Sequence, residues 1–141
     1  NHTNYTNSTR TAISDSNSGT LWTVSFNKLA SGTDLLIVGT MYAYGNGASG
    51  ATNATVKYGS GTEYHGGFGL KQTAGGDWSF GTPICMYISG HTTTGAQDLV
   101  LGWDFGDASS SKPWTILNPN STDGARFSTM NSFLTIMELT T

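Results

Sequence analysis

Charged side chains are scarce in this sequence, because Lys, Arg, Asp and Glu together make up only 11% of its 141 residues. An average soluble domain carries about 25%. The six basic residues form no cluster, and the sequence pI is near 5.3. A surface that binds nucleic acid needs clustered Lys and Arg to neutralise phosphates, so we expect no nucleic-acid partner.

Cysteine and long apolar runs are also nearly absent. Cys85 is the single cysteine, which excludes an intrachain disulfide and any metal motif built on paired cysteines. It lies in "PICMYIS", and we expect a buried thiol on a strand. No apolar run approaches the ~18 residues of a membrane helix, so we expect no membrane insertion. The histidines are dispersed, whereas zinc needs convergent ligands; we therefore expect neither a metal nor a cofactor.

The residues that are abundant favour strands joined by tight turns. The sequence contains 19 glycines and 11% aromatic residues, with many Ser, Thr and Asn. In "LWTVSFN", Trp22, Val24 and Phe26 alternate with polar residues and with Leu21, which predicts a half-buried strand. No segment has helical periodicity over two turns. About eight to ten short strands with turns between them predict an all-β antiparallel sandwich or barrel.

The first ten residues differ in composition from the rest. "NHTNYTNSTR" repeats N-x-T with no apolar periodicity. We interpret residues 1–10 as a linker or the end of a stalk, and residues 11–141 as the folded domain. The repeats are also glycosylation sequons, although such sequons arise easily by chance in a chain rich in Asn and Thr.

Two predicted strands are apolar on both faces. They are "LLIVGTMYAY", Leu35 to Tyr44, and "SFLTIMEL", Ser132 to Leu139. A sandwich core covers only one face of a sheet, so the second face needs another cover. Symmetric association provides it, because one patch serves every copy. We interpret the C-terminal strand as central in its sheet and close to an oligomer interface; the alternative is that a loop of the same chain covers it.

The C-terminal pattern resembles a known family. Ser128, Thr129 and the stretch Leu134 to Leu139 are similar to the last strand of complement-C1q/tumour-necrosis-factor-like (C1q/TNF-like) jelly rolls, above all those of bacteriophage fibre tips and capsids. The segment "TLWTVSFNKLASGTDLLIVGTMYAYG" also resembles those domains. The resemblance covers roughly residues 10 to 139. It implies a jelly roll of ten strands that forms a homotrimer, with the last strand near the three-fold axis.

Two groups of candidate site residues follow. The trimer interface is expected on the C-terminal strand, at Phe133, Leu134, Thr135, Ile136, Met137 and Leu139. Aromatic residues beside polar loops can stack on sugar rings, which favours ligand contact at Tyr64, His65, Trp78 and Trp114. The alternative for these four is that each anchors its own loop.

Catalytic patterns are weak in this sequence. "DFG" at 104–106 lacks the glycine loop, strand lysine and catalytic loop of a kinase. Asp104 and Asp107 form a possible carboxylate pair for acid–base chemistry or Ca²⁺, but stabilising a turn is the simpler interpretation. There is no G-x-S-x-G elbow, although a catalytic triad is defined by geometry rather than by sequence. We therefore expect no enzymatic activity.

Together these features predict a non-enzymatic module on the virion surface. We expect a trimeric fibre head that contacts a host-surface glycan or receptor, with its N-terminal segment joined to other virion proteins. The first alternative is a purely structural capsid decoration or fibre protein without a receptor. Two further alternatives are a monomeric carbohydrate-binding module and a hydrolase or lyase acting on surface polysaccharide.

Overall fold

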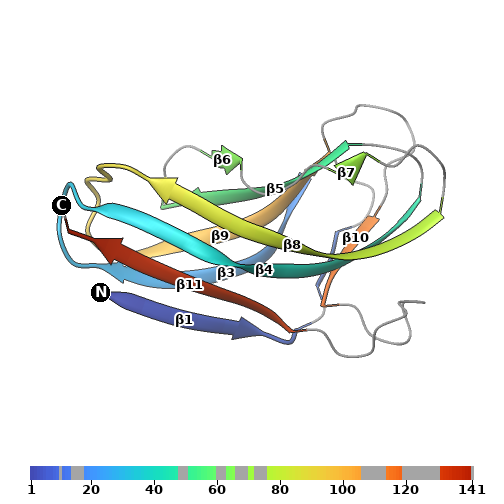
Figure 1. Cartoon of the computed structure of the whole chain (residues 1–141), viewed down its shortest axis with the longest axis horizontal. Coiled ribbons are helices and arrows are strands. Elements are labelled where there is room, and N and C mark those ends of the chain that lie inside the picture. Colours follow the sequence, from blue (N-terminus) through green and yellow to red (C-terminus); the bar gives the residue numbers. More distant parts are fainter. Residues whose placement is uncertain are drawn as a thin grey trace.

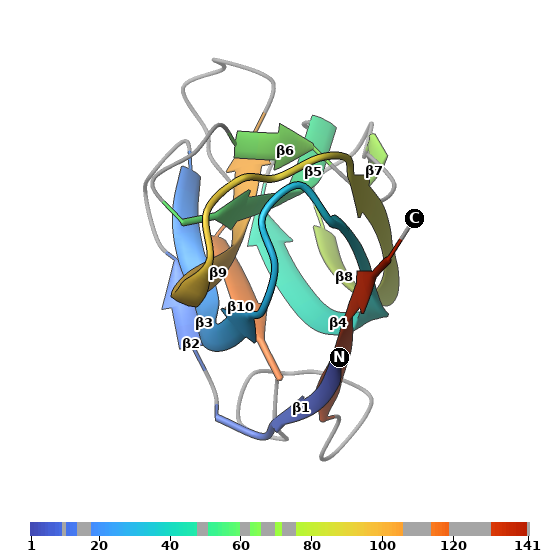
Figure 2. The ribbon, with the colours of Figure 1, turned by 90° about the vertical axis from the view of Figure 1, so that its left-hand side faces the viewer.

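The chain folds as two stacked antiparallel sheets (Figures 1 and 2). The computed structural model describes residues 1–9, 11–13, 18–47, 51–59, 63–65, 70–71, 76–105, 114–118 and 131–140. Within the strands, the side chains at 12–13, 18, 43–47, 51–54, 63–65, 70–71, 76–80, 82, 103–105 and 114–117 are not described.

Sheet A contains the N- and C-terminal strands. Its order is β1 (His2–Asn7), β11 (Ser132–Leu139), β4 (Asp34–Gly47), β10 (Trp114–Leu117) and β2 (Thr11–Ile13), and β8 (Gly76–Ile88) pairs with the other side of β4. Sheet B has the order β3 (Ser18–Lys28), β9 (Gly95–Phe105), β5 (Ala51–Tyr58) and β6 (Glu63–His65), and β7 (Leu70–Lys71) also pairs with β5. The described residues contain no helix, so the predicted all-β sandwich is confirmed.

The hydrophobic core lies between the two sheets. Sheet A contributes Leu35, Ile37, Met41, Ile84, Met86, Ile88, Leu134 and Ile136, and sheet B contributes Leu21, Val24, Phe26, Val56, Tyr58, Leu99 and Leu101. Fully burying one such side chain stabilises the fold by about 1.5–3 kcal/mol. The C-terminal strand β11 is paired on both sides, as predicted, and β4, the other strand that is apolar on both faces, is also paired on both sides.

The sequence places one side chain of β3 on the wrong face. Strict alternation puts Leu21 on the outer face, but Leu21 is 3% exposed and belongs to the core. The register between β3 and β9 shifts between Thr20 and Trp22, which is a β-bulge. A bulge inserts one extra residue, so Leu21 and Trp22 both turn toward the core.

Residues 2–7 form a strand, which corrects the prediction of a linker over residues 1–10. β1 pairs with β11 from His2↔Met137 to Asn7↔Ser132. Its polar sequence suits an edge strand, because alternate side chains face solvent while Tyr5 packs against the core. The Tyr5 hydroxyl donates to the Ser25 carbonyl at 2.6 Å, and Asn1 Nδ2 donates to the Asn27 carbonyl at 2.8 Å. β1 therefore fastens the edge of sheet A to the β3 edge of sheet B.

Cys85 is exposed, which corrects the prediction of a buried thiol. Its neighbours Ile84 and Met86 point into the core, so alternation directs Cys85 to the outer face of sheet A. Because both faces of β8 are apolar, the residue pattern alone could not decide which one is buried.

A buried carboxylate fastens the end of β11 to the turn after β3. Glu138 accepts hydrogen bonds from the N–H groups of Leu29 at 2.9 Å and Ala30 at 2.8 Å. It also accepts one from the Thr33 hydroxyl at 2.7 Å, and the buried Lys28 ammonium lies 3.9 Å away. Burial opposes ionisation, but these donors and the Lys28 charge outweigh it and lower the pKa of Glu138 to about 2.

Candidate functional site

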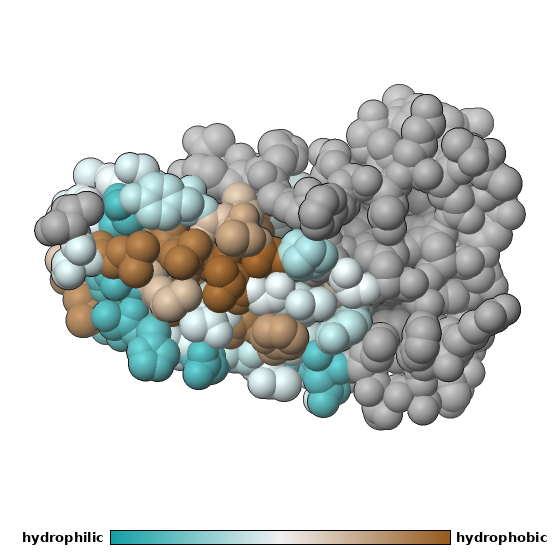
Figure 3. Space-filling model, viewed as in Figure 1, coloured by the Kyte–Doolittle hydropathy of each residue, from teal (hydrophilic) through white to brown (hydrophobic). Residues whose placement is uncertain are grey.

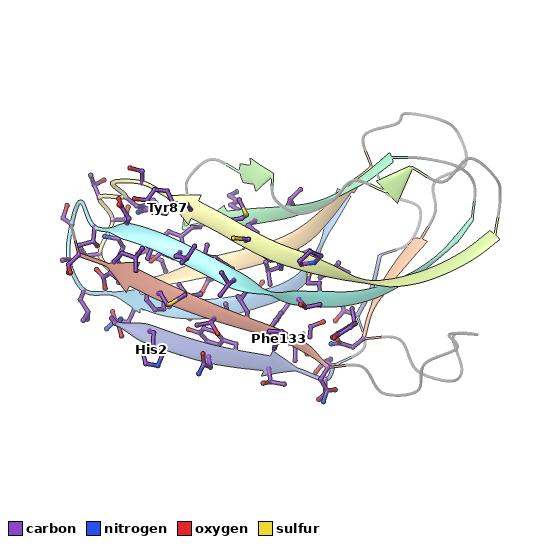
Figure 4. All side chains as sticks on the ribbon, viewed as in Figure 1. His2, Tyr87 and Phe133 are labelled. Carbon is purple, nitrogen blue, oxygen red and sulfur yellow. The ribbon has the colours of Figure 1, made fainter. Side chains whose placement is uncertain are left out.

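The outer face of sheet A is the main candidate site. We use this name for the outward side chains of four adjacent strands. They are His2, Asn4 and Thr6 on β1, Phe133, Thr135, Met137 and Leu139 on β11, Leu36, Val38, Thr40 and Tyr42 on β4, and Gly81, Pro83, Cys85 and Tyr87 on β8. Figure 4 shows His2, Phe133 and Tyr87 on three of these strands.

The strand register brings the apolar members of this face together. Leu36 lies opposite both Met137 and Tyr87, and Val38 lies opposite Cys85. In Figure 3, hydrophobic residues form a band over β4 and its neighbours, bordered by hydrophilic residues on the side of β1. Two large side chains of the face are well exposed, Tyr87 at 57% and Phe133 at 47%. An exposed apolar area that spans several strands is typical of an interaction site.

The outer face of sheet A contains no Lys, Arg or Glu. Asp34, at the start of β4, is 6% exposed and directs its charge into the loop after β8. It accepts hydrogen bonds from the Tyr87 hydroxyl and, at 2.7 Å, from the Gly90 N–H. These two bonds, the Tyr87 bond first, lower the pKa of Asp34. The face can therefore be covered by an apolar surface without the cost of desolvating a free charge.

The residues predicted at the interface divide between the two faces of β11. Phe133, Thr135, Met137 and Leu139 belong to the outer face of sheet A. Leu134 and Ile136 are 1% and 0% exposed and lie in the core of the single chain. These two side chains are therefore already covered and cannot touch another copy directly.

Sequence reasoning missed the part of this face that β8 contributes. Tyr87, Cys85 and Pro83 lie beside the outward side chains of β4. The available signal was the apolarity of "PICMYIS" on both faces, the same property that drew attention to β4 and β11. Interpreting that stretch as a strand with one buried thiol overlooks its outer row.

The aromatic residues predicted to contact a ligand lie in different sheets. Tyr64 and His65 are on β6 of sheet B, opposite Val56 and Thr55. Trp78 on β8 and Trp114 on β10 lie on the two sides of β4, opposite Gly45 and Asn46. The backbone thus separates these residues into two pairs, and their side chains lie outside the described ones.

The described part of the chain offers no further candidate for a catalytic or metal site. Asp104 is on β9, its side chain is not described, and Asp107 lies outside the described residues. Among the described residues, no group of three or more His, Cys, Asp or Glu could hold a metal ion. The same residues include no helix of the length and apolarity that a membrane span requires.

The fold is an all-β antiparallel sandwich of the jelly-roll type, and solved structures of a viral protein share it. The VP2 subviral particle of infectious bursal disease virus aligns with a TM-score of 0.58 at 16% identity, over 97% of this chain and 33% of that chain. A structure of the Gt strain of infectious bursal disease virus gives 0.57 at 15% identity, over 97% and 33%. A mutant VP2 in T=1 particles gives 0.56 at 15% identity, over 97% and 32%.

This chain therefore spans about a third of the length of those chains. At such low identity the likeness is one of fold. No protein-family model and no curated protein matches the sequence. The more specific resemblance to C1q/TNF-like domains of bacteriophage fibres is not tested by these comparisons and stays a prediction.

Proposed function

We propose that this chain is a non-enzymatic structural module of a virion, exposed on the particle surface, that assembles with copies of itself through the outer face of sheet A. The observation that carries the proposal is the uncharged apolar area across β11, β4 and β8. The likeness of the fold to VP2 of infectious bursal disease virus supports a place in a virion.

The assembly is a homotrimer in this proposal. The resemblance of the C-terminal strand to C1q/TNF-like domains supports three copies, and the outward row of β11 supplies the contact. Phe133, Met137 and Leu139 would meet another copy, with Leu36 and Tyr87 beside them. A symmetric assembly can bury the same patch on each copy, which suits a surface without charge.

The trimer would act as a fibre head that touches a host surface. Three equivalent weak sites bind a surface far more tightly together than one does alone. Tyr64, His65, Trp78 and Trp114 are the aromatic candidates for glycan contact. Other virion proteins would meet the N-terminal segment, which is β1 of sheet A.

The molar mass in dilute solution tests the assembly, by light scattering behind a sizing column. We expect the mass of three chains. Met137→Glu places a charge in the outer face of sheet A and should yield a monomer that stays folded. Its matched control is Ser25→Glu, at an exposed position on the outward face of sheet B, which should remain trimeric. A wild-type monomer, or identical masses for the two variants, would contradict the proposal.

A purely structural role in a shell is the second candidate function. Two of the similar structures are VP2 in particles, which supports a place in a shell. Labelled trimer applied to a glycan array and to host cells separates the two roles. Binding that the Met137→Glu monomer loses supports the fibre head, and no binding by the intact trimer supports the structural role.

A further inference from the structure

The free edge of β8 differs from the β3 edge of sheet B. Among the described strands, β8 pairs only with β4, over an uninterrupted register from Leu35↔Ile88 to Gly47↔Gly76. The β3 edge is interrupted by a bulge, and its Ser25 and Asn27 carbonyls accept hydrogen bonds from the side chains of Tyr5 and Asn1. β8 has no such bulge, and from Trp78 to Ile88 it carries no charged residue.

Hydrogen bonds around Tyr42 show which way the β8 backbone faces. The Tyr42 N–H donates to Ser132 Oγ at 3.0 Å, and its carbonyl accepts from the Asn118 N–H at 2.9 Å. The Tyr42 backbone is therefore turned away from β8. In an antiparallel ladder, directly opposed residues either bond to each other or both turn away, so its partner Gly81 also turns away from β4.

The same alternation applies to Pro83, Cys85 and Tyr87. Their carbonyls, and the N–H groups of Cys85 and Tyr87, point toward the free edge. Pro83 agrees with this direction, because proline has no N–H and fits a strand only where its nitrogen faces away from the neighbour. Unpaired N–H and C=O groups in a row are a template for another strand, and natural edges usually block them with Lys, bulges or short strands.

We propose that β8 pairs edge to edge with β8 of a second copy, antiparallel and about a two-fold axis, over residues 82–88. In a register centred on Cys85, each Cys85 N–H faces the Cys85 carbonyl of the other copy, and each Tyr87 N–H faces the Pro83 carbonyl. Ile84 then lies opposite Met86 on the core side. The pairing extends sheet A across two copies and leaves the outer face of sheet A free, so it is a second contact beyond the proposed trimer.

The composition of β8 favours its own copy as the occupant. In a two-fold contact every residue near the axis meets itself or a close neighbour in sequence, so a charge there would repel its own copy. β8 has none in this stretch. The side chains of β8 are mostly apolar on its core side and on its outer side. A second copy of β8 therefore places apolar side chains beside both rows.

Amide hydrogen exchange at increasing protein concentration tests the contact. We expect the N–H groups of Cys85 and Tyr87 to exchange rapidly in dilute solution and at least about tenfold more slowly when copies associate. Packing through the outer face of sheet A alone would leave these two amides unprotected at every concentration, and that result would overturn the proposal without affecting the trimer.

A matched pair of variants at Cys85 provides the second test. Cys85→Pro removes one N–H that faces the edge, as Pro83 does two residues earlier, whereas Cys85→Ala keeps it. Both variants change the same side chain in the outer face of sheet A, so only the N–H distinguishes them. Sedimentation should show the two-fold association about tenfold or more weaker for the proline variant than for the alanine variant. Equal association of the two variants would overturn the proposal. If the proline variant fails to fold, the exchange of the wild-type amides still decides the question.

Discussion

The two sheets share one core but present opposite surfaces to the outside. The outer face of sheet B exposes polar side chains, namely Thr23, Ser25 and Asn27 on β3 and Asp98 on β9. The outer face of sheet A instead exposes apolar side chains. Core packing requires an apolar row on the inner face of each sheet and places no such demand on the outer one. Core packing therefore does not explain the apolar outer row of sheet A, which is why we propose that it serves assembly.

The strongest test of sheet A concerns a glycine that lets β4 approach β11. A Cβ at Gly39 would lie 2.2 Å from the Phe133 carbonyl oxygen and 2.9 Å from Leu134 Cα, both backbone atoms. We expect Gly39→Ala to cost about 4 kcal/mol or more, so that the chain fails to fold. Its control is Gly81→Ala, which meets the movable Tyr42 ring at 2.9 Å and should cost about 1 kcal/mol. Urea unfolding followed by fluorescence measures both, and equal stability would disprove the close approach.

Glu138 gives the next largest effect, and the sign of its pH dependence is defined. Its pKa falls from 4.5 to about 2 in the folded chain, so its stabilising effect is full above pH 4.5 and is lost as the pH falls toward 2. Glu138→Gln should cost about 3 kcal/mol at pH 7, because it leaves Lys28 buried and unpaired.

Glu138→Gln should also lose less stability than the wild type as the pH falls from 4.5 to 2. Asp98→Asn, on the exposed face of sheet B, is the control and should change the free energy of unfolding by less than about 0.5 kcal/mol. Urea titrations across this pH range measure both variants. A Glu138→Gln variant as stable as the wild type at pH 7 would show that the carboxylate does not hold the turn.

Exchanging the character of the two outer faces tests the comparison directly. Leu36→Thr with Val38→Thr makes sheet A resemble sheet B, and we expect the proposed trimer to be lost while the free energy of unfolding changes by about 1 kcal/mol. Thr23→Val with Ser25→Val makes the reverse change and should add a new tendency to self-associate. Sedimentation at several concentrations measures both. If neither pair of substitutions alters association, the outer faces play no part in assembly.

The smallest expected effects on stability come from substitutions at two tyrosines. Burial, and then the nearby Glu138 and Tyr5, raise the pKa of Tyr58 to about 12, and its hydroxyl has no hydrogen-bond partner among the described residues. Tyr58→Phe should therefore leave stability unchanged or raise it by about 0.5 kcal/mol. Tyr5→Phe breaks the bond to the Ser25 carbonyl and should cost about 1 kcal/mol. Thermal unfolding ranks the two variants, and the reverse order would mean that the Tyr58 hydroxyl is satisfied.

Alternation predicted much of the fold, and it failed where local geometry breaks the pattern. It placed Val24 and Phe26 in the core, but the bulge before Trp22 reversed Leu21. It could not decide the exposure of Cys85, because both rows of β8 are apolar. The strand β1 was missed because its partner lies more than a hundred residues away, and a polar edge strand has no local apolar signal.

The candidate site was predicted only in part, for a related reason. The apolarity of β11 on both faces pointed to a contact surface, but the pattern alone did not say which row faces outward. The outward row was defined only when Leu134 and Ile136 were found in the core. The neighbours of that row on β4 and β8 depend on strand order, which follows from long-range pairing rather than from any local motif.

The pairing of β1 with β11 has a consequence for the order of folding. His2 lies opposite Met137, so one edge of sheet A cannot close until nearly the whole of this sequence has left the ribosome. Until then β4 lacks its neighbour β11, and an apolar strand with an open side is prone to pair with other chains. The early-made strands of sheet A must therefore wait for the last one, and crowded nascent chains would be most exposed to mispairing during that interval.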